Sequence, residues 1–439
     1  MSSSRRFGIL ALVAACSMAG CSSCSHRPSG DGGVQAAGDG ATATAGPPAT
    51  PAPLSLPIAA DHGANGNVYV AGFVAARGAI SLSRFDDSGR LMWAVDVLGG
   101  LAFSPDERLD VMATSRGPVV AWHGLADGGR ARVARLVSED GKVQGAPFAT
   151  GAGACATRDA LYWIGSKDAV VEWPLPSGPE KKLATVGEGR DPTLVCGDAR
   201  AFLVDDGEDD IAARSLEAGK AGTRSHLLTD EELGDDDMRE HDDYSFGDTL
   251  ADLLLTEQGH LIHRRFTDKP SPRAPLAHVV ASDEDLMAVD GNASRMVAIL
   301  TRDASARCDG DLGTDVLALD VADGSGEHLV DVAHGDCARD LGPYWVAPTT
   351  DAVYVAWNVR GPRSRSGNAP GAVKAPVEAL AWAKLGAAGA PAELKTVPLS
   401  AEDVVFAGCG PTRCWFAALG RPDGTDGMVP GEARVIAIP

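Results

Sequence analysis

Short apolar runs recur along most of the chain, separated by glycine, proline, aspartate and serine. Most of these runs are followed, after a turn, by a second apolar segment of similar length. The strong runs occupy residues 68–72, 119–122, 160–164, 201–204, 251–255, 296–300, 353–357 and 414–418. The segments that follow them occupy residues 80–85, 133–137, 170–175, 211–216, 261–266, 316–321, 377–382 and 435–438. No long stretch has the apolar spacing of an amphipathic helix, so the pattern predicts an all-β protein.

The spacing between successive strong runs points to one architecture. It is roughly 40 to 60 residues, which is the range of a propeller blade. A four-stranded blade cannot cover both of its faces alone, whereas blades arranged radially cover one another. Eight units can be traced from residue 54 onward. We therefore predict a β-propeller over residues 54–439 with eight blades, or seven if the faint unit near residues 242–280 is not a blade.

The two ends of this domain suggest how the ring closes. The last unit ends at residues 435–439, one strand short, and residues 53–58 form an unassigned strand at the other end. Pairing these two segments would close the ring and remove its exposed strand edges. We therefore expect the first and last strands to be neighbours in one sheet.

The first unit carries a sequence likeness. The run Gly66–Gly72, the turn Arg84–Gly89 and Trp93 resemble the bacterial β-propeller repeat known as the SBBP type. The likeness covers residues 66–93, and the other units keep only its apolar rhythm. The resemblance implies the propeller fold and no particular chemistry, because propellers serve many functions.

The same unit contains a second, shorter likeness. Asp86, Gly89 and Trp93 resemble the Asp-x-x-Gly-x-x-x-Trp element of quinoprotein propellers. In those enzymes the element recurs in most blades, and its tryptophans lock the blades together. Here it occurs once, so we predict that Trp93 is a packing residue and not part of a cofactor site.

The amino terminus follows a different pattern. Arg5 and Arg6 precede an apolar run, residues 7–15, that is too short to span a bilayer, and Cys21 follows small residues. This order of basic head, apolar core and cysteine resembles the signal of bacterial lipoproteins, in which a lipid is attached to that cysteine. The resemblance implies a signal peptide over residues 1–20 and lipidation of Cys21. Cys16 as the lipidated residue, or plain secretory cleavage, is the alternative.

The next segment, residues 21–53, has almost nothing to bury. It is rich in glycine, alanine, proline and threonine, a composition that predicts a disordered tether. A coil of about thirty such residues has an end-to-end distance on the order of 30 Å. Such a tether would hold a folded domain clear of the membrane surface.

Composition restricts the partners. The chain has 439 residues, 44% of them hydrophobic, which is enough for a large core. Its formal net charge is −21, and the signal peptide would remove two arginines and no acid. Such a surface repels nucleic acid and anionic lipid. It suits cations or basic partners, although a solvated acidic surface is the ordinary interpretation.

The predicted domain contains six cysteines, an even number. Three pairs are suggested by position: Cys409 with Cys414 across a turn, two cysteines in loops of one unit, and two at matching places in adjacent units. The pairs are Cys155–Cys196, Cys308–Cys337 and Cys409–Cys414. An even count in an exported protein favours disulfides. A metal site is the rival interpretation, but no histidine stands at ligand spacing from the pairs.

Two acidic loops are candidates for calcium, a hard cation that prefers oxygen ligands. The candidate ligands are Asp235, Asp236, Asp237, Asp309, Asp311 and Asp315. Neither loop has the glycine of an EF-hand, so a solvated insertion near residues 229–247 is the favoured interpretation of the larger one, and no cofactor is predicted. Thr229 and Glu232 also fit a capping box, which predicts a short helix.

No catalytic motif stands out. His260 and His263 are three apart, which places them on opposite faces of a strand and is poor for one metal. We therefore expect a lipid-anchored binding or scaffolding module of a bacterial cell envelope, at the outer membrane, with a protein or polysaccharide partner. The alternative is an envelope enzyme, namely a hydrolase, a lyase or a quinoprotein-like dehydrogenase, with its site at the channel mouth of the propeller.

Overall fold

The computed structural model describes most of the chain after residue 52. The residues outside it are 1–52, 64, 100–107, 127–128, 177, 187–189, 198–199, 208–209, 234–235, 273, 305–306, 309–312, 323–325, 338, 363–374, 387–392 and 422–430. The predicted signal peptide, both candidate lipidation cysteines, Cys16 and Cys21, and the tether up to residue 52 therefore lie outside the described residues.

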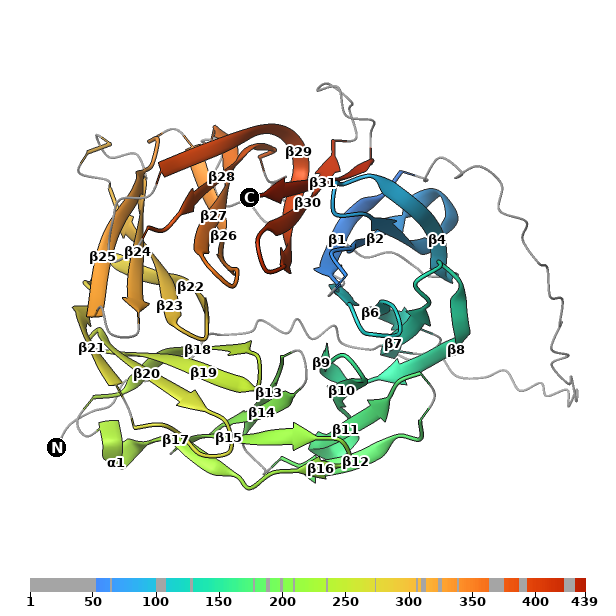
Figure 1. Ribbon diagram of the computed structural model, residues 1–439, viewed down its shortest axis with the longest axis horizontal. Coiled ribbons are helices and arrows are strands. Elements are labelled where there is room, and N and C mark those ends of the chain that lie inside the picture. The colour runs from blue at the N-terminus through green and yellow to red at the C-terminus, as the bar shows by residue number, and fades with distance from the viewer. Residues whose placement is uncertain are drawn as a thin grey trace, which may run out of the picture. The chain divides into compact units, whose positions relative to one another are not determined.

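The described strands form a ring of antiparallel sheets, which identifies the fold as a β-propeller (Figure 1). The first three sheets contain four strands each. Their strands are β1 (Ser55–His62), β2 (Val68–Val74), β3 (Ala79–Phe85) and β4 (Leu91–Gly99); β5 (Arg108–Met112), β6 (Val119–Ala126), β7 (Gly129–Val137) and β8 (Val143–Thr150); and β9 (Ala152–Ala156), β10 (Ala160–Ile164), β11 (Ala169–Pro174) and β12 (Lys181–Thr185). Two 3-10 turns, Ala75–Arg77 and Ser166–Asp168, lie between strands.

The next three sheets follow the same order. Their strands are β13 (Asp191–Cys196), β14 (Ala201–Asp206), β15 (Asp210–Glu217), β16 (Lys220–Ala221) and β17 (Ser225–Thr229); β18 (Met238–Phe246), β19 (Thr249–Thr256), β20 (His260–Phe266) and β21 (Ala274–Val279); and β22 (Glu284–Asn292), β23 (Arg295–Asp303), β24 (Thr314–Ala322) and β25 (Gly326–His334). A short helix, α1 (Asp230–Leu233), follows β17.

The seventh sheet has six strands. They are β26 (Arg339–Pro348), β27 (Val353–Pro362), β28 (Val377–Lys384), β29 (Glu393–Cys409), β30 (Cys414–Gly420) and β31 (Ala433–Ile438). The first part of β29 pairs with β28 and the second part with β30, and Ala401 is common to both pairings. The described ring thus has seven sheets, because the seventh and eighth sequence units share β29 and do not separate. The faint unit near residues 242–280 is a complete four-stranded sheet, β18 to β21, so the number seven is right but the reason expected for it is wrong.

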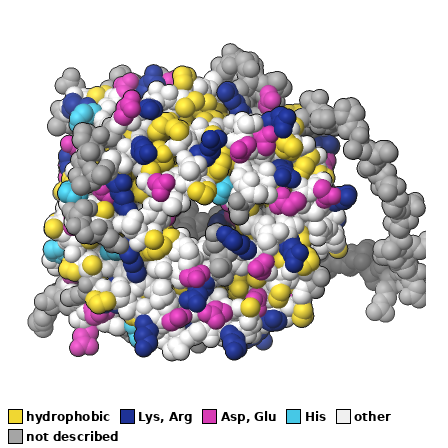
Figure 2. Space-filling model, viewed as in Figure 1, with side chains coloured by type: hydrophobic (Ala, Val, Ile, Leu, Met, Phe, Trp, Pro, Cys, Tyr) yellow, Lys and Arg dark blue, Asp and Glu magenta, His cyan; other side chains and the backbone are white. Residues whose placement is uncertain are grey.

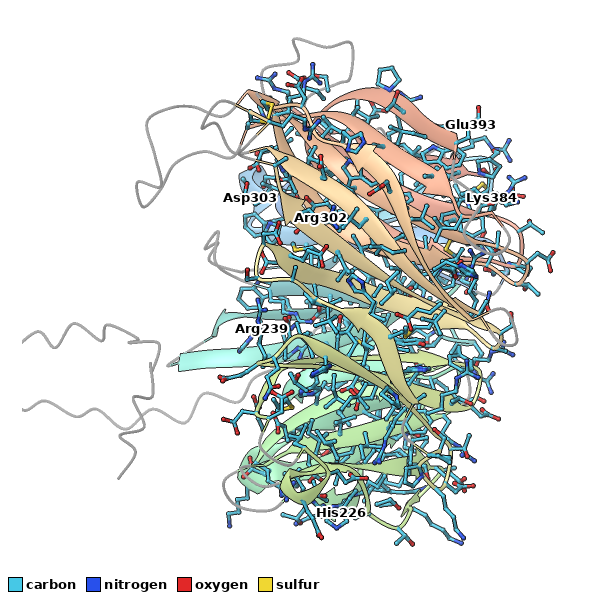
Figure 3. All side chains as sticks on the ribbon, turned by 90° about the vertical axis from the view of Figure 1, so that its left-hand side faces the viewer. His226, Arg239, Arg302, Asp303, Lys384 and Glu393 are labelled. Atoms are coloured by element: carbon cyan, nitrogen blue, oxygen red, sulfur yellow. A yellow bond between two sulfur atoms is a disulfide. The ribbon has the colours of Figure 1, made fainter. Side chains whose placement is uncertain are left out.

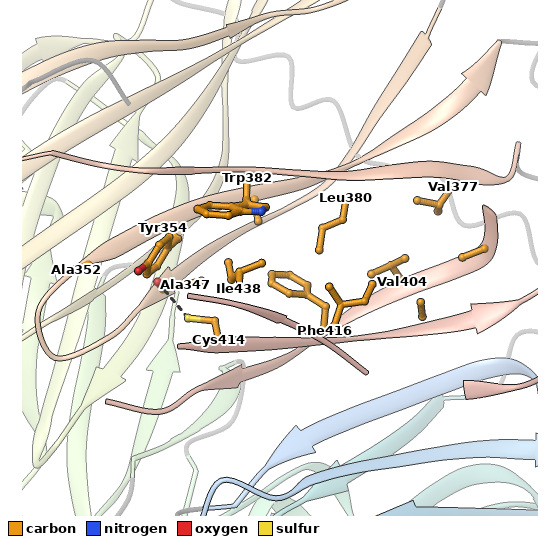
Figure 4. Close-up of a cluster of buried hydrophobic side chains, with 14 residues drawn as sticks. Ala347, Ala352, Tyr354, Val377, Leu380, Trp382, Val404, Cys414, Phe416 and Ile438 are labelled. Carbon is orange, nitrogen blue, oxygen red and sulfur yellow. Dashed lines mark hydrogen bonds between the residues drawn. The ribbon is translucent and has the colours of Figure 1, made fainter. Parts of the chain in front are cut away.

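The two halves of the seventh sheet face each other like neighbouring blades. Tyr354 and Trp382 from the first half and Phe416 from the second belong to one buried cluster (Figure 4). The Trp345 ring meets the Phe416 ring edge-on at 5.4 Å between centroids. The core of this sheet therefore lies between its halves, as the core of a propeller lies between blades.

Each strong apolar run is the second strand of its unit. All seven residues of β2 are buried, because neighbouring sheets cover both of its faces. Val68 and Val70 pack against Trp415 of the last sheet. Tyr69 and Ala71, which point the other way, pack toward the second sheet. Burial on both faces explains why these strands are continuous apolar runs and do not alternate with polar residues.

The ring closes by face-to-face packing. The prediction that residues 53–58 pair with the last strand is wrong, because β1 pairs only with β2 and β31 only with β30. The two ends are nevertheless adjacent, since the Leu54 N–H donates to the Gly431 carbonyl at 2.8 Å and Leu54 packs beside Leu419. β1 is the first of the four strands of its own sheet, so it is not available as the missing strand of the last sheet.

The ring has two distinct ends. Figure 3 shows Lys384 and Glu393 at one end and Arg239 and Asp303 at the other. Lys384 ends β28 and Glu393 begins β29, so the first end carries the connections from third to fourth strands. Because adjacent strands are antiparallel, it also carries the connections from first to second strands. We call it the turn end.

Candidate functional site

A shallow, open groove of about 420 Å³ lies at the turn end, where turns of the second and third sheets meet. Its walls come from the β5–β6 turn, from the β7–β8 turn with the start of β8, and from the segment after β11. The lining residues are Ser115, Arg116, Ser138, Glu139, Asp140, Gln144 and Pro176. We call this the turn groove.

The β7–β8 turn that forms one wall is clamped by the first sheet. The Trp93 Nε1–H donates to the Glu139 carbonyl at 3.0 Å, and the Arg84 guanidinium donates to the same oxygen. The Tyr69 hydroxyl lies 2.8 Å from both carboxylate oxygens of Glu139. Gly141 has φ +82°, and a Cβ there would lie 2.9 Å from the Trp93 ring. The wall is therefore held rigidly, and Trp93 is a packing residue between blades, as predicted.

A second tryptophan makes the same contact where the ring closes. The Trp415 Nε1–H donates to the Asp87 carbonyl at 3.4 Å, and the Trp415 ring stacks on His62 with 4.8 Å between centroids. In both cases a turn between the third and fourth strands of one sheet docks on the previous unit. Sequence reasoning missed this lock because Trp415 lies within a strong strand and outside the Asp-x-x-Gly element.

The groove presents charges of both signs. Hydrogen bonds from Lys142 and Ser138 hold the pKa of Asp140 down at about 2, so this exposed carboxylate is ionised at any physiological pH. Within the described residues the Arg116 guanidinium has no ion-pair partner, and Arg116 is exposed. Hydroxyls of Ser115 and Ser138 and the Gln144 amide add neutral donors and acceptors. This arrangement suits a polar ligand with both acceptor and donor groups.

A second polar region lies on the inner strands of the fifth and sixth sheets. Asp242 and Asp243 are on β18 and Asp290 is on β22. Burial, with the nearby carboxylates of Asp242 and Asp206, raises the pKa of Asp243 to about 7. Burial, with Asp242 nearby, raises the pKa of Asp290 to about 7 although the Gly291 N–H donates to it. Asp243 and Asp290 therefore take up protons near neutrality, unlike Asp140.

The stretch around residues 229–247 is only partly the predicted insertion. Its first residues form α1, and the Glu232 carboxylate accepts the Thr229 N–H at 3.2 Å, as a capping box requires. Its second half is β18, the inner strand of the fifth sheet. That half is a strand of the sheet and not a solvated insertion: Asp242 lies on the face of β18 from which Tyr244 packs toward the sixth sheet, and Asp243 lies on the opposite face, near Asp206 of the fourth sheet.

The three predicted disulfides are present. Cys155–Cys196 joins the inner strands of the third and fourth sheets, Cys308–Cys337 lies within the sixth unit, and Cys409–Cys414 spans the β29–β30 turn. The metal interpretation of these cysteines is therefore replaced by covalent links, of which one joins two neighbouring blades.

The calcium candidates fall into two groups. Asp235, Asp309 and Asp311 lie outside the described residues. Asp236 accepts the Gln258 N–H at 3.1 Å, and Asp315 is paired with Arg307 and accepts the Gly335 N–H. The Asp237 carbonyl accepts the Glu257 N–H. Among the described residues no group of three or more His, Cys, Asp or Glu side chains could hold a metal ion, and calcium binding stays an untested alternative.

The surface seen down the ring axis is mixed. Figure 2 shows acidic and basic side chains interspersed over this face, with a hollow at the centre of the ring. In the part of the chain with assigned structure, no helix is both long and apolar enough to cross a membrane.

Comparisons with known proteins give likeness in structure only. No family model matches the chain, and no curated protein matches it. The chain is similar to BamB from Moraxella catarrhalis, at 11% identity over 86% of this chain and 95% of that chain, with a TM-score of 0.41. It is similar to the polysaccharide lyase Uly1, at 7% identity over 86% and 89%, with a TM-score of 0.45. It is also similar to a prolyl endopeptidase, at 16% identity over 84% of this chain but 53% of that chain, with a TM-score of 0.46. Values this low support no inference about function.

Proposed function

We propose that the protein is a lipid-anchored β-propeller of a bacterial cell envelope that binds a partner, a protein or a polysaccharide, at its turn end. The clamped turn groove is the observation that carries this proposal. Its β7–β8 wall is fixed by Trp93, Arg84 and Tyr69 from the neighbouring sheet. A wall that is already ordered loses little entropy on binding, so its polar groups can contribute affinity.

The place at which the described chain enters the ring fits this role. Ser55 begins β1 and pairs with Phe73 at the far end of β2, whereas Asn65 in the β1–β2 turn contacts Glu139 at the groove. The chain therefore enters the ring at the end opposite the turn end. A tether from Cys21 attached there would leave the groove free to face a partner. The three disulfides fit the oxidising surroundings of an exported protein.

The anchor is tested by replacing Cys21. Detergent phase partitioning of cell extracts should place the wild-type protein in the detergent phase and Cys21→Ala in the aqueous phase. Cys16→Ala is the matched control and should stay with the detergent. If Cys21→Ala remains in the detergent phase and Cys16→Ala leaves it, Cys16 is the lipidated residue. If both remain, the lipid anchor is wrong.

The contact surface is tested by photo-crosslinking in intact cells. A photoreactive residue at position 116 or 140 should give a discrete adduct of higher mass. The same residue at Val279, which is exposed on an outer strand, should give none. Equal labelling from all three positions, or adducts from Val279 alone, would remove the turn groove from the proposal.

An envelope hydrolase or lyase is a second candidate, favoured by the acids on β18 and β22. General acid–base chemistry at neutral pH uses carboxyl groups whose pKa values lie near 7, as those of Asp243 and Asp290 do. Purified protein would be incubated with envelope polysaccharide and peptide substrates. Turnover that is lost in Asp290→Asn and kept in Asp140→Asn would favour the enzyme over the binding module.

A further inference from the structure

Two buried aspartates are neighbours on adjacent strands of the fifth sheet. Asp243 on β18 is directly opposite Asp252 on β19, which is in turn opposite Arg264 on β20. Residues directly opposite in an antiparallel pair have Cβ atoms about 5 Å apart. The three side chains therefore form a row on one face of this sheet.

The row faces the fourth sheet. Leu250 and Leu254, two residues on either side of Asp252, pack in one cluster with Phe202 and Val204 of β14. Side chains two residues apart on a strand point to the same face. Asp252 therefore enters the seam between the fourth and fifth sheets, which we call the fourth–fifth seam.

Asp252 lies deep in this seam without a hydrogen-bond donor. Its residue is 1% exposed, and neither carboxylate oxygen has a hydrogen-bond partner. The Asp243 side chain is 5% exposed, and its Oδ1 also has no partner. A buried carboxylate without a donor is strongly unfavourable, whereas a carboxylic acid can donate to a neighbouring carboxylate.

The surrounding charges do not neutralise the two acids. The groups that face them from the adjoining elements are Arg264 on β20, Glu232 on α1, Asp206 on β14 and His241 on β18. Asp242 is also nearby but lies on the opposite face of β18. Arg264 is already paired with Glu232. His241 lies 4.0 Å from Asp206 and 3.7 Å from Asp243, so its ring is divided between two carboxylates.

We propose that Asp243 and Asp252 share a proton, and that this proton keeps the fourth–fifth seam closed, so that the ring loosens there as the solution becomes alkaline. Of the three disulfides, Cys155–Cys196 joins the third and fourth sheets, and the other two lie within the sixth and seventh. None of the three crosses this seam. It depends on packing and on the charge state of its acids.

The sign of the effect follows from linkage. Burial, with the Asp243 carboxylate, raises the pKa of Asp252 well above its usual range, against the opposing effect of Arg264. Burial raises the pKa of Asp243 to about 7. In the unfolded chain both acids titrate near pH ~4. The stability that the proton contributes is therefore full below about pH 4 and is lost as pH rises through the folded-state pKa values.

The test measures urea unfolding between pH 5 and pH 9. While the folded protein holds one proton more than the unfolded chain, the unfolding constant rises about tenfold per pH unit. Asp252→Asn removes the titrating group and gives the seam a neutral hydrogen-bond donor. The unfolding constant of this variant should therefore lack the tenfold rise per pH unit that the extra proton causes, and the variant should be more stable than wild type at pH 9. Asp243→Asn should act in the same direction. Asp285→Asn, at an exposed position on β22, should keep the wild-type slope.

Hydrogen exchange and infrared spectroscopy show where the ring loosens and whether the shared proton is present. Hydrogen exchange, corrected for intrinsic rates, should rise at pH 9 first in peptides covering β18 to β20, and less in Asp252→Asn. Infrared spectra of wild type at pH 7 should contain more protonated carboxyl absorption than spectra of Asp252→Asn, in which the contribution of Asp290 remains. An unchanged slope in both Asn variants would overturn the proposal. If neither variant folds, the absence of protonated carboxyl absorption from wild type would overturn it.

Discussion

The Cys155–Cys196 disulfide allows a worked prediction of stability. It links residues 41 apart in sequence and joins the inner strands of two neighbouring sheets. In the chain-entropy description, closing a loop of that length in the unfolded chain stabilises the fold by about 4 kcal/mol. Cys409–Cys414 closes a loop of only 5 residues and should contribute about 2 kcal/mol. Cys155→Ala with Cys196→Ala should therefore cost about twice as much as Cys409→Ala with Cys414→Ala.

The assay is equilibrium unfolding in urea of both double variants and the wild type, without reductant and at pH 6. Cys155 and Cys196 are only partly buried, so replacing them leaves little cavity, whereas replacing the fully buried Cys414 leaves a cavity whose cost opposes the predicted order. Mass spectrometry must first show that the remaining disulfides are intact. Equal losses in the two variants, or a larger loss for the short loop, would refute the reasoning from loop length.

Three further substitutions test the locks between and within blades. Trp93→Phe keeps most of the packing but removes the hydrogen bond to the Glu139 carbonyl, so urea unfolding should show a loss of about 1 kcal/mol. Gly141→Ala places a Cβ against the Trp93 ring at a left-handed φ and should lower the melting temperature more than Gly145→Ala, which meets nothing within 4 Å. Arg295→Met leaves Asp320 buried without the partner that now donates to both its oxygens at 2.6 Å, and should cost about 3–5 kcal/mol. A loss below 1 kcal/mol in that variant would show that Asp320 finds another partner or a proton.

The apolar pattern predicted the second and third strands of every unit because these strands are covered on both faces. β2 is buried throughout, and a run such as 68–72 has no other stable place than between two sheets. The disulfide partners could be predicted because Cys155 and Cys196 hold equivalent positions in consecutive repeats. These features depend on local composition and on repetition, which a single sequence contains.

Features that depend on contacts between units were not predictable in the same way. The acids of β18 resemble a solvated charge run, and only the register with β19 and the neighbouring sheet places Asp243 and Asp252 inside a seam. β29 was not foreseen because polar residues interrupt its apolar ones and its two halves pair with different neighbours. The turn groove was missed because serine, glutamate and aspartate in turns are common in any soluble protein.

The central claim, that the turn groove is the binding surface, is tested most directly in the Cys21→Ala background, in which the proposed lipid is absent. Purified Cys21→Ala protein would be mixed with washed envelopes from cells lacking it, and the bound fraction measured by sedimentation. We predict saturable binding that is lost when Arg116→Ala and Asp140→Ala are added, and kept when Lys395→Ala, on an outer strand, is added instead. Binding that is unchanged by the two groove substitutions, or no saturable binding by the Cys21→Ala protein at all, would contradict the claim.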